Sequence, residues 1–155
     1  MPDTDTATTA TATTATVTTG GSIAFADWKE DEAAAVEAGP RLARASVANT
    51  FTGGIEAART TCEYTLAYAP GDTGVFTGLE LVTGGVEGRE GAFVLEHHGS
   101  FHPDGTIRCT FTVLPGTATG ALTGLHGSGE YTCRPGEPTF AYAFRYGYGD
   151  GREQG

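Results

Sequence analysis

Three side chains are of types that can carry proton transfer: Glu80, His97 and Glu63. Glu80 lies in a strand-like run, and His97 follows apolar residues at alternate positions. Burial raises the pKa of a carboxyl group, and histidine titrates near neutral pH, so both can act as acid or base. We therefore take Glu80 and His97 as the first candidate catalytic residues and Glu63 as the third.

Each of the three also has a purely structural interpretation. Glu80 stands out of phase with Leu79 and Leu81, which favours a solvated carboxylate on the outer face of a sheet. His97 can be a hydrogen-bonded core or rim residue, and Glu63 can pair with an arginine across strands. Simple alternation assigns Glu80 and His97 to different strand phases. A shared site therefore requires both to reach one cavity, for instance through a β-bulge.

A second polar group, Glu96, His97, His98 and His102, has metal-ligand residue types. On a strand, however, His97 would point to the opposite face from the other three. The sequence therefore predicts no metal site and no cofactor. The glycines around His126 have turn or bulge spacing, which is unlike a phosphate-binding loop, and we find no Gly-x-Ser-x-Gly or Cys/His nucleophile pattern.

Aromatic residues are the candidate ligand-binding groups. Their first role is to fill a core, but in a hollow structure some of them line a pocket that favours a flat or unsaturated apolar molecule. The residues expected at such a pocket are Trp28, Tyr64, Phe93, Phe111 and Tyr142.

The elements that position these residues are strands, because apolar residues alternate with others along much of the chain. The alternation is clearest over 61–68, 107–113 and 139–146, and weaker strands are expected at 22–28, 43–52, 75–82, 92–101 and 127–133. It places Ile107, Cys109, Phe111 and Val113 on a buried face. Glycine and proline pairs, Gly84-Gly85 among them, mark the turns. About eight short strands predict an antiparallel barrel or sandwich.

One segment departs from this pattern. Asp27 to Glu30 has the residue types of a helix capping box, an alanine-rich stretch follows, and Gly39-Pro40 is a stop signal. We therefore expect one short helical segment near residues 29–38, carried on a loop. The sequence has no βαβ repeat, so a parallel sheet is disfavoured.

Charge and cysteine content limit the function classes. The 155-residue chain has a formal net charge of −10 and only 9 Lys and Arg residues. This argues against nucleic acid and anionic membranes as partners. The N-terminus lacks a basic region followed by an apolar one, and the three cysteines lack metal-type spacing, so we expect reduced thiols in a cytoplasmic protein.

The chain divides into three parts. Residues 1–20 are nearly all Thr and Ala and are expected to form a flexible tail, disordered over residues 1–13. Residues 21–149 are expected to form the β-barrel domain, and residues 150–155 a polar C-terminal fringe.

Two stretches carry a family resemblance. The first contains Gly78-Leu79-Glu80, Thr83-Gly84 and 88–99 (GREGAFVLEHHG), and the second is 113–127 (VLPGTATGALTGLHG). With Trp28-Lys29-Glu30 and the segment 39–47, they make the chain resemble a family of small bacterial proteins, domain of unknown function 3224, over about residues 22–146. Phe111 departs from the family pattern, which has a Trp there.

The resemblance implies the fold of allene oxide cyclase, an eight-stranded antiparallel β-barrel with an internal cavity. It implies much less about activity, because no residue-level match to the site of that enzyme is visible.

We therefore predict a small-molecule-binding β-barrel. Its leading function is a cyclase- or isomerase-type reaction on an apolar, unsaturated metabolite held in the cavity, and the sequence leaves open whether it is an enzyme at all. A non-catalytic carrier or sensor of a small apolar ligand is one alternative, and a structural or interaction barrel with a filled interior is another. A homo-oligomer is compatible with the sequence.

Overall fold

The structure, a computed structural model, describes residues 16–71 and 73–149, and most of them lie in strands. The strands are β2 (Val17–Ala35), β3 (Arg41–Gly53), β4 (Ile55–Glu56), β5 (Thr61–Tyr68), β6 (Gly74–Val86), β7 (Arg89–Phe101), β8 (Ile107–Val113), β9 (Leu125–Cys133) and β10 (Thr139–Tyr148). Among these residues the helical element is one 3₁₀ turn, η2 (Gly120–Leu122). The predicted all-β class is confirmed.

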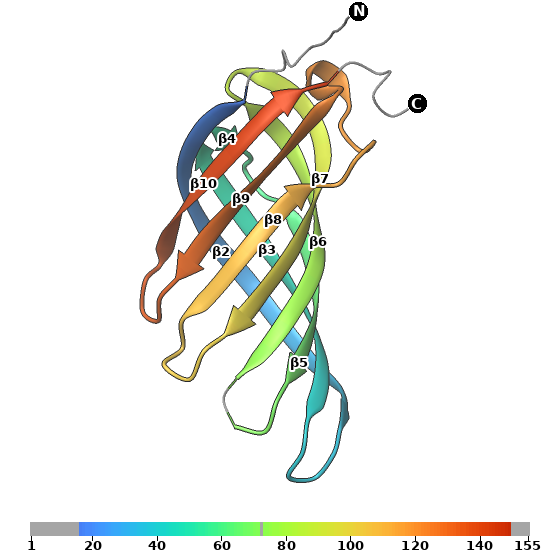
Figure 1. Cartoon of the computed structure of the whole chain (residues 1–155), viewed down its shortest axis with the longest axis vertical. Helices are drawn as coiled ribbons and strands as arrows, with labels where there is room; N and C mark the ends of the chain where they lie inside the picture. Colours follow the sequence, from blue (N-terminus) through green and yellow to red (C-terminus); the bar gives the residue numbers. More distant parts are fainter. Residues whose placement is uncertain (1–15, 72, 150–155) are drawn as a thin grey trace, which may run out of the picture.

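All nine strands belong to one sheet in the order β4-β6-β5-β3-β2-β10-β9-β8-β7, and β6 also pairs with β7. The two-residue strand β4 is a side branch on β6, so the other eight strands close in a ring (Figure 1). The pairings around the ring are antiparallel, as predicted.

The interior of the ring differs between its two ends. The connections β2–β3, β5–β6, β7–β8 and β9–β10 lie at the lower end in Figure 1, and β4 lies at the upper end. Side chains near β4 and η2 form the larger packed cluster, which includes Phe51, Phe93, Phe111, Leu122 and Phe144. In β8, Cys109, Phe111 and Val113 are buried and Ile107 is half-buried, so the predicted inward face is confirmed.

The predicted helix near residues 29–38 is wrong. Lys29 to Ala35 continue β2 and pair with β3, and the chain turns only at Val36–Pro40, where Gly39 N donates to Val36 O at 2.8 Å. A bulge lies between Ala26 and Lys29, and Asp27 in it has φ of 62°. A helix cap contributes only about 1 kcal/mol, whereas pairing with β3 satisfies backbone groups along the whole segment.

The turn predicted at Gly84-Gly85 is also wrong, because both residues lie inside β6. The chain reverses at Glu87 and Gly88, which have φ of 47° and 91°. Gly84 is required for another reason: a Cβ atom there would lie 2.0 Å from the carbonyl oxygen of Glu56 in β4. The glycine thus permits close approach of two backbones.

The first strand starts earlier than the predicted domain. Val17 to Gly20 pair with Ala143 to Tyr146 of β10, so they belong to the sheet. The predictions for residues 1–13 and 150–155 lie outside the described residues. In the described part of the chain, no helix has the length and apolar character needed to cross a bilayer.

Candidate functional site

Glu80 and His97 meet inside the ring on adjacent strands. His97 pairs with Gly78, and Glu80 pairs with Leu95, so the two side chains are diagonal neighbours on one face of the β6–β7 ladder. Both are buried, with relative exposures of 0% and 1%. The pairing of β6 with β7 continues from end to end without a register shift. No bulge was therefore needed to bring them together.

The assignment of Glu80 and His97 to different strand phases is wrong. Leu79 and Leu81 lie on the outer face of the ring and are 51% and 53% exposed, while Phe76 and Val82 share the inner face with Glu80. Gly78 lies on the same inner face and is covered by Tyr64: a Cβ atom at Gly78 would lie 2.5 Å from the Tyr64 ring.

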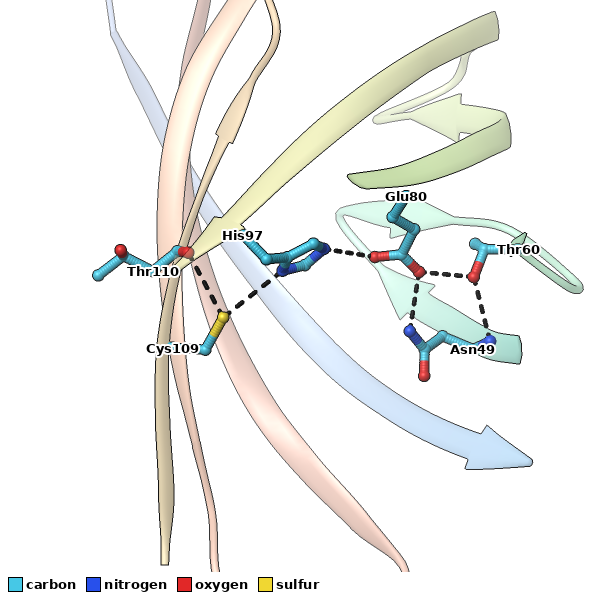
Figure 2. Close-up of polar contacts among 6 residues, drawn as sticks. All are labelled: Asn49, Thr60, Glu80, His97, Cys109 and Thr110. Carbon is cyan, nitrogen blue, oxygen red and sulfur yellow. Dashed lines mark hydrogen bonds and ion pairs between the residues drawn. The ribbon is translucent and has the colours of Figure 1, made fainter. Parts of the chain in front are cut away.

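Three donors from separate segments surround the Glu80 carboxylate (Figure 2). His97 Nε2 lies 2.7 Å from Oε1. Asn49 Nδ2 of β3 donates to Oε2 at 2.8 Å, and Thr60 Oγ1 donates to the same oxygen at 2.5 Å. Thr60 Oγ1 also accepts from the backbone N–H of Asn49 at 3.0 Å. These contacts satisfy a carboxylate that would otherwise be costly to bury.

The second nitrogen of His97 faces a thiol. Nδ1 lies 3.5 Å from Cys109 Sγ, which itself donates to Thr110 O at 3.4 Å. Burial by itself lowers the pKa of His97, but the hydrogen bonds to Cys109 and Glu80 and the charge of Glu80 outweigh it and raise the pKa to about 9. At neutral pH the ring is therefore an imidazolium paired with the carboxylate. Sequence patterns missed this Cys–His contact because no local motif brings Cys109 to His97.

A cavity of about 210 Å³ has this pair in its wall and is partly open to solvent, since Phe25 and Trp28 in its wall are exposed. Glu80, His97 and Asn49 line it, and most of its wall is apolar: Ile23, Phe25, Trp28, Val47, Tyr64, Leu66, Phe76, Phe101, Ile107, Tyr131, Cys133 and Phe140. Several of these residues, such as Phe101 and Phe140, lie near the hairpin connections at the lower end of Figure 1. The cavity therefore occupies the end of the ring opposite β4.

Cys62 adds a third potential ligand atom to the pair. One donor atom each of Cys62, Glu80 and His97 lies within 4.8 Å of the others, a set that could hold a transition metal. In the structure, however, His97 and Glu80 contact each other directly. Burial, together with the charge of Glu80, raises the pKa of Cys62, which keeps its thiol protonated. In this arrangement Glu80 and His97 form a hydrogen-bonded pair that holds a proton between them.

The other predicted site residues fall into two groups. Trp28 and Tyr64 line the cavity, with ring centroids 6.1 Å apart. Phe93, Phe111 and Tyr142 belong to the packed cluster instead, although the Phe111 ring lies 5.9 Å from that of His97. Tyr142 donates its hydroxyl to backbone carbonyls.

Glu63 does not join the site. Cys62 and Tyr64 on either side of it face inward, so Glu63 is exposed on the outer face. Asn49, Thr60 and Cys109 are the site residues that sequence reasoning missed. For Asn49 a signal existed, because it shares the inward phase of β3 with Ala45 and Val47.

The fold and site together define a class: a small protein built from one closed antiparallel sheet, with the larger apolar cluster at one end, a cavity within a smaller cluster at the other, and a buried Glu–His pair between them. The chain belongs to the family described as Protein of unknown function (DUF3224), whose pattern matches residues 19–146.

A solved structure supports this assignment. It is the crystal structure of a protein with unknown function from the DUF3224 family of Shewanella oneidensis MR-1, 29% identical, with a TM-score of 0.67. The match covers 88% of this chain and 98% of the other. No curated protein matches the chain.

Proposed function

We propose that this chain is a small-molecule-binding β-barrel, similar to allene oxide cyclase in architecture, whose cavity holds an apolar, unsaturated metabolite. The observation that carries the proposal is the position of the Glu80–His97 pair at the inner end of an aromatic-lined cavity. A mostly apolar pocket with a few convergent polar groups and a perturbed pKa is the usual form of a ligand site.

The reaction we propose is a cyclisation or isomerisation. A rigid cavity can fold a flexible unsaturated substrate by shape, and orientation alone can lower a barrier by several kcal/mol. His97 is protonated at neutral pH and serves as the proton donor, while Glu80 stabilises its charge. The partner of Nδ1 is the sulfur of Cys109, a weak acceptor, so a substrate oxygen, which is a stronger acceptor, can take its place.

A non-catalytic carrier or sensor is the second candidate, and one observation favours it. Glu80 accepts from three protein donors, and both nitrogens of His97 have protein neighbours, so the pair is already satisfied without a ligand. The free thiols of Cys62, Cys109 and Cys133 are compatible with a reducing compartment such as the cytoplasm.

Native mass spectrometry of the full chain with a metabolite extract of the source organism tests the binding. Ile107 lines the cavity, so Ile107→Trp should block uptake, while Leu79→Trp on the outer face is the matched control. Once a ligand is identified, Glu80→Gln separates enzyme from carrier. A catalyst should lose turnover by about 10²-fold or more, whereas a carrier shows no turnover to lose. Equal uptake by both tryptophan variants would contradict a cavity site.

A further inference from the structure

We infer that the cavity selects a neutral ligand the size of one substituted ring, carrying a hydroxyl that donates to Asn49 Oδ1, as a phenol or enol does. This inference rests on the proposed binding function and specifies its ligand class.

The orientation of the Asn49 amide follows from its partner. Its nitrogen donates to Glu80 Oε2, which also accepts from Thr60 Oγ1, so the amide oxygen points the other way (Figure 2). Among the described residues, Oδ1 has no hydrogen-bond donor, although Asn49 is only 7% exposed and lines the cavity. Oδ1 is also not fully buried, so a ligand in the cavity can reach it. Oδ1 is thus a strong acceptor left open to the cavity.

The polar groups next to Asn49 have fewer free hydrogen-bonding positions for a ligand. Glu80 already accepts three hydrogen bonds, and each nitrogen of His97 faces a protein group. The hydroxyls of Tyr64 and Tyr131 also line the cavity, but a phenol oxygen is a weaker acceptor than an amide oxygen, so a ligand hydroxyl finds its strongest free acceptor in Asn49. A ligand without a donor would leave Oδ1 buried and unpaired, which is unfavourable.

Charge excludes anionic ligands. Of the residues that line the cavity, Glu80 and His97 are the charged ones, and they neutralise each other. A carboxylate in this cavity would have no counter-ion of its own, and the chain as a whole has a net charge of −10. Burial raises the pKa of Tyr64 and of Tyr131, so both hydroxyls are neutral.

The volume of the cavity and the residues of its wall indicate the size and chemistry of the rest of the ligand. A cavity of about 150 Å³ lined by apolar side chains can bind benzene, so about 210 Å³ suits one ring with small substituents. The wall presents aromatic rings in sequence, with centroid separations of 5.0 Å for Tyr64–Phe76 and 5.4 Å for Phe76–Phe101. Such a wall favours a flat, unsaturated body.

The test uses the full chain and compares three probes that share a methyl-substituted benzene ring: toluene, p-cresol with a hydroxyl group, and p-toluate with a carboxylate. Binding is followed by calorimetry and by fluorescence of Trp28, the only tryptophan, which lines the cavity. We expect p-cresol to bind at least about fivefold more tightly than toluene, as one added hydrogen bond implies, and p-toluate not to bind at pH 7.

Two variants assign the preference to Asn49. Asn49→Leu removes the acceptor, so the advantage of p-cresol should disappear. Thr60→Val removes a different donor to Glu80 and leaves Oδ1 in place, so the advantage should persist. Where Asn49→Leu fails to fold, contacts between p-cresol and the Asn49 side-chain amide in NMR spectra of the wild-type chain decide the point, and their absence overturns the inference.

The outcomes separate this inference from the proposed function. Equal affinity for toluene and p-cresol, or preference for p-toluate, overturns the inference and leaves a ligand-binding cavity standing. Binding of none of the three probes overturns both.

Discussion

Replacing Glu80 by Gln should remove a pH-dependent part of the stability. Burial by itself lowers the pKa of His97, but the contacts with Cys109 and Glu80 raise it from 6.5 to about 9. A group with a raised pKa in the folded state binds its proton more tightly there. Its contribution to stability is therefore complete below pH 6.5 and is lost as the pH rises through 9. The difference between the two pKa values corresponds to about 3 kcal/mol of unfolding free energy.

Urea unfolding at pH 6 and pH 9.5, followed by far-ultraviolet circular dichroism, measures this loss. The groups that face His97 are Glu80 on β6, Cys62 and Tyr64 on β5, Cys109 on β8 and Tyr131 on β9. Burial raises the pKa values of Cys62, Tyr64 and Tyr131, which keeps these groups protonated over the range. A Cys109→Ser variant measures the share of the effect that comes from the contact of Cys109 with His97.

The wild-type chain should lose more stability than Glu80→Gln between these pH values, with about 3 kcal/mol as the upper limit of the difference, because the contact of His97 with Cys109 remains in the variant. In NMR spectra, the ring proton of His97 should titrate near pH 9 in the wild-type chain and at lower pH in the variant. An equal loss of stability in both proteins would refute the reasoning, as would a His97 that titrates at or below pH 6.5.

Three further predictions concern packing and exposure. Gly84→Ala should destabilise the fold by about 1–3 kcal/mol in thermal unfolding, because its Cβ would lie 2.0 Å from a carbonyl oxygen, whereas Gly39→Ala, whose Cβ would lie 3.1 Å from the nearest atom, a methyl carbon of Val36, should cost less. In thiol titration, the half-buried Cys133 should react before Cys62 and Cys109, and the denatured chain should show all three thiols; a lower total would mean a disulfide. Leu79→Lys should leave both stability and the oligomeric state, measured by native mass spectrometry, unchanged, because the Leu79 side chain is about half exposed. A strong loss of stability, or a change in oligomeric state, would show that a second copy of the chain covers the outer face of β6.

Alternation predicted the strands best where one face is fully buried. In β8 and β5 the inward residues are large and apolar and the outward ones polar, so pattern and structure agree. In β2 the residues from Lys29 to Ala35 are exposed on both faces, so no apolar period marks them as a strand. Local capping signals then favoured a helix, and only pairing with β3 decides the matter.

The site shows a different limit. The chemistry of Glu80 and His97 is visible in the sequence, but the phase of β6 is ambiguous, because leucines occupy its outer face while Phe76 and Val82 occupy the inner one. The contacts of Glu80 with Asn49 and Thr60 depend on segments about 20 to 31 residues away, and no local pattern encodes that separation.

The position of the Glu80–His97 pair is itself an argument for a ligand. Replacing a buried ion pair by apolar residues of similar volume is often neutral or stabilising, so such a pair is weak evidence for a purely structural role. Around Phe111 and Phe144 this protein fills its interior with apolar side chains. The pair instead lies where the packed end gives way to the cavity, together with an amide oxygen that no described donor satisfies. A charge network needed only for stability has no reason to border an open space, whereas one that positions or protonates a bound molecule must do so.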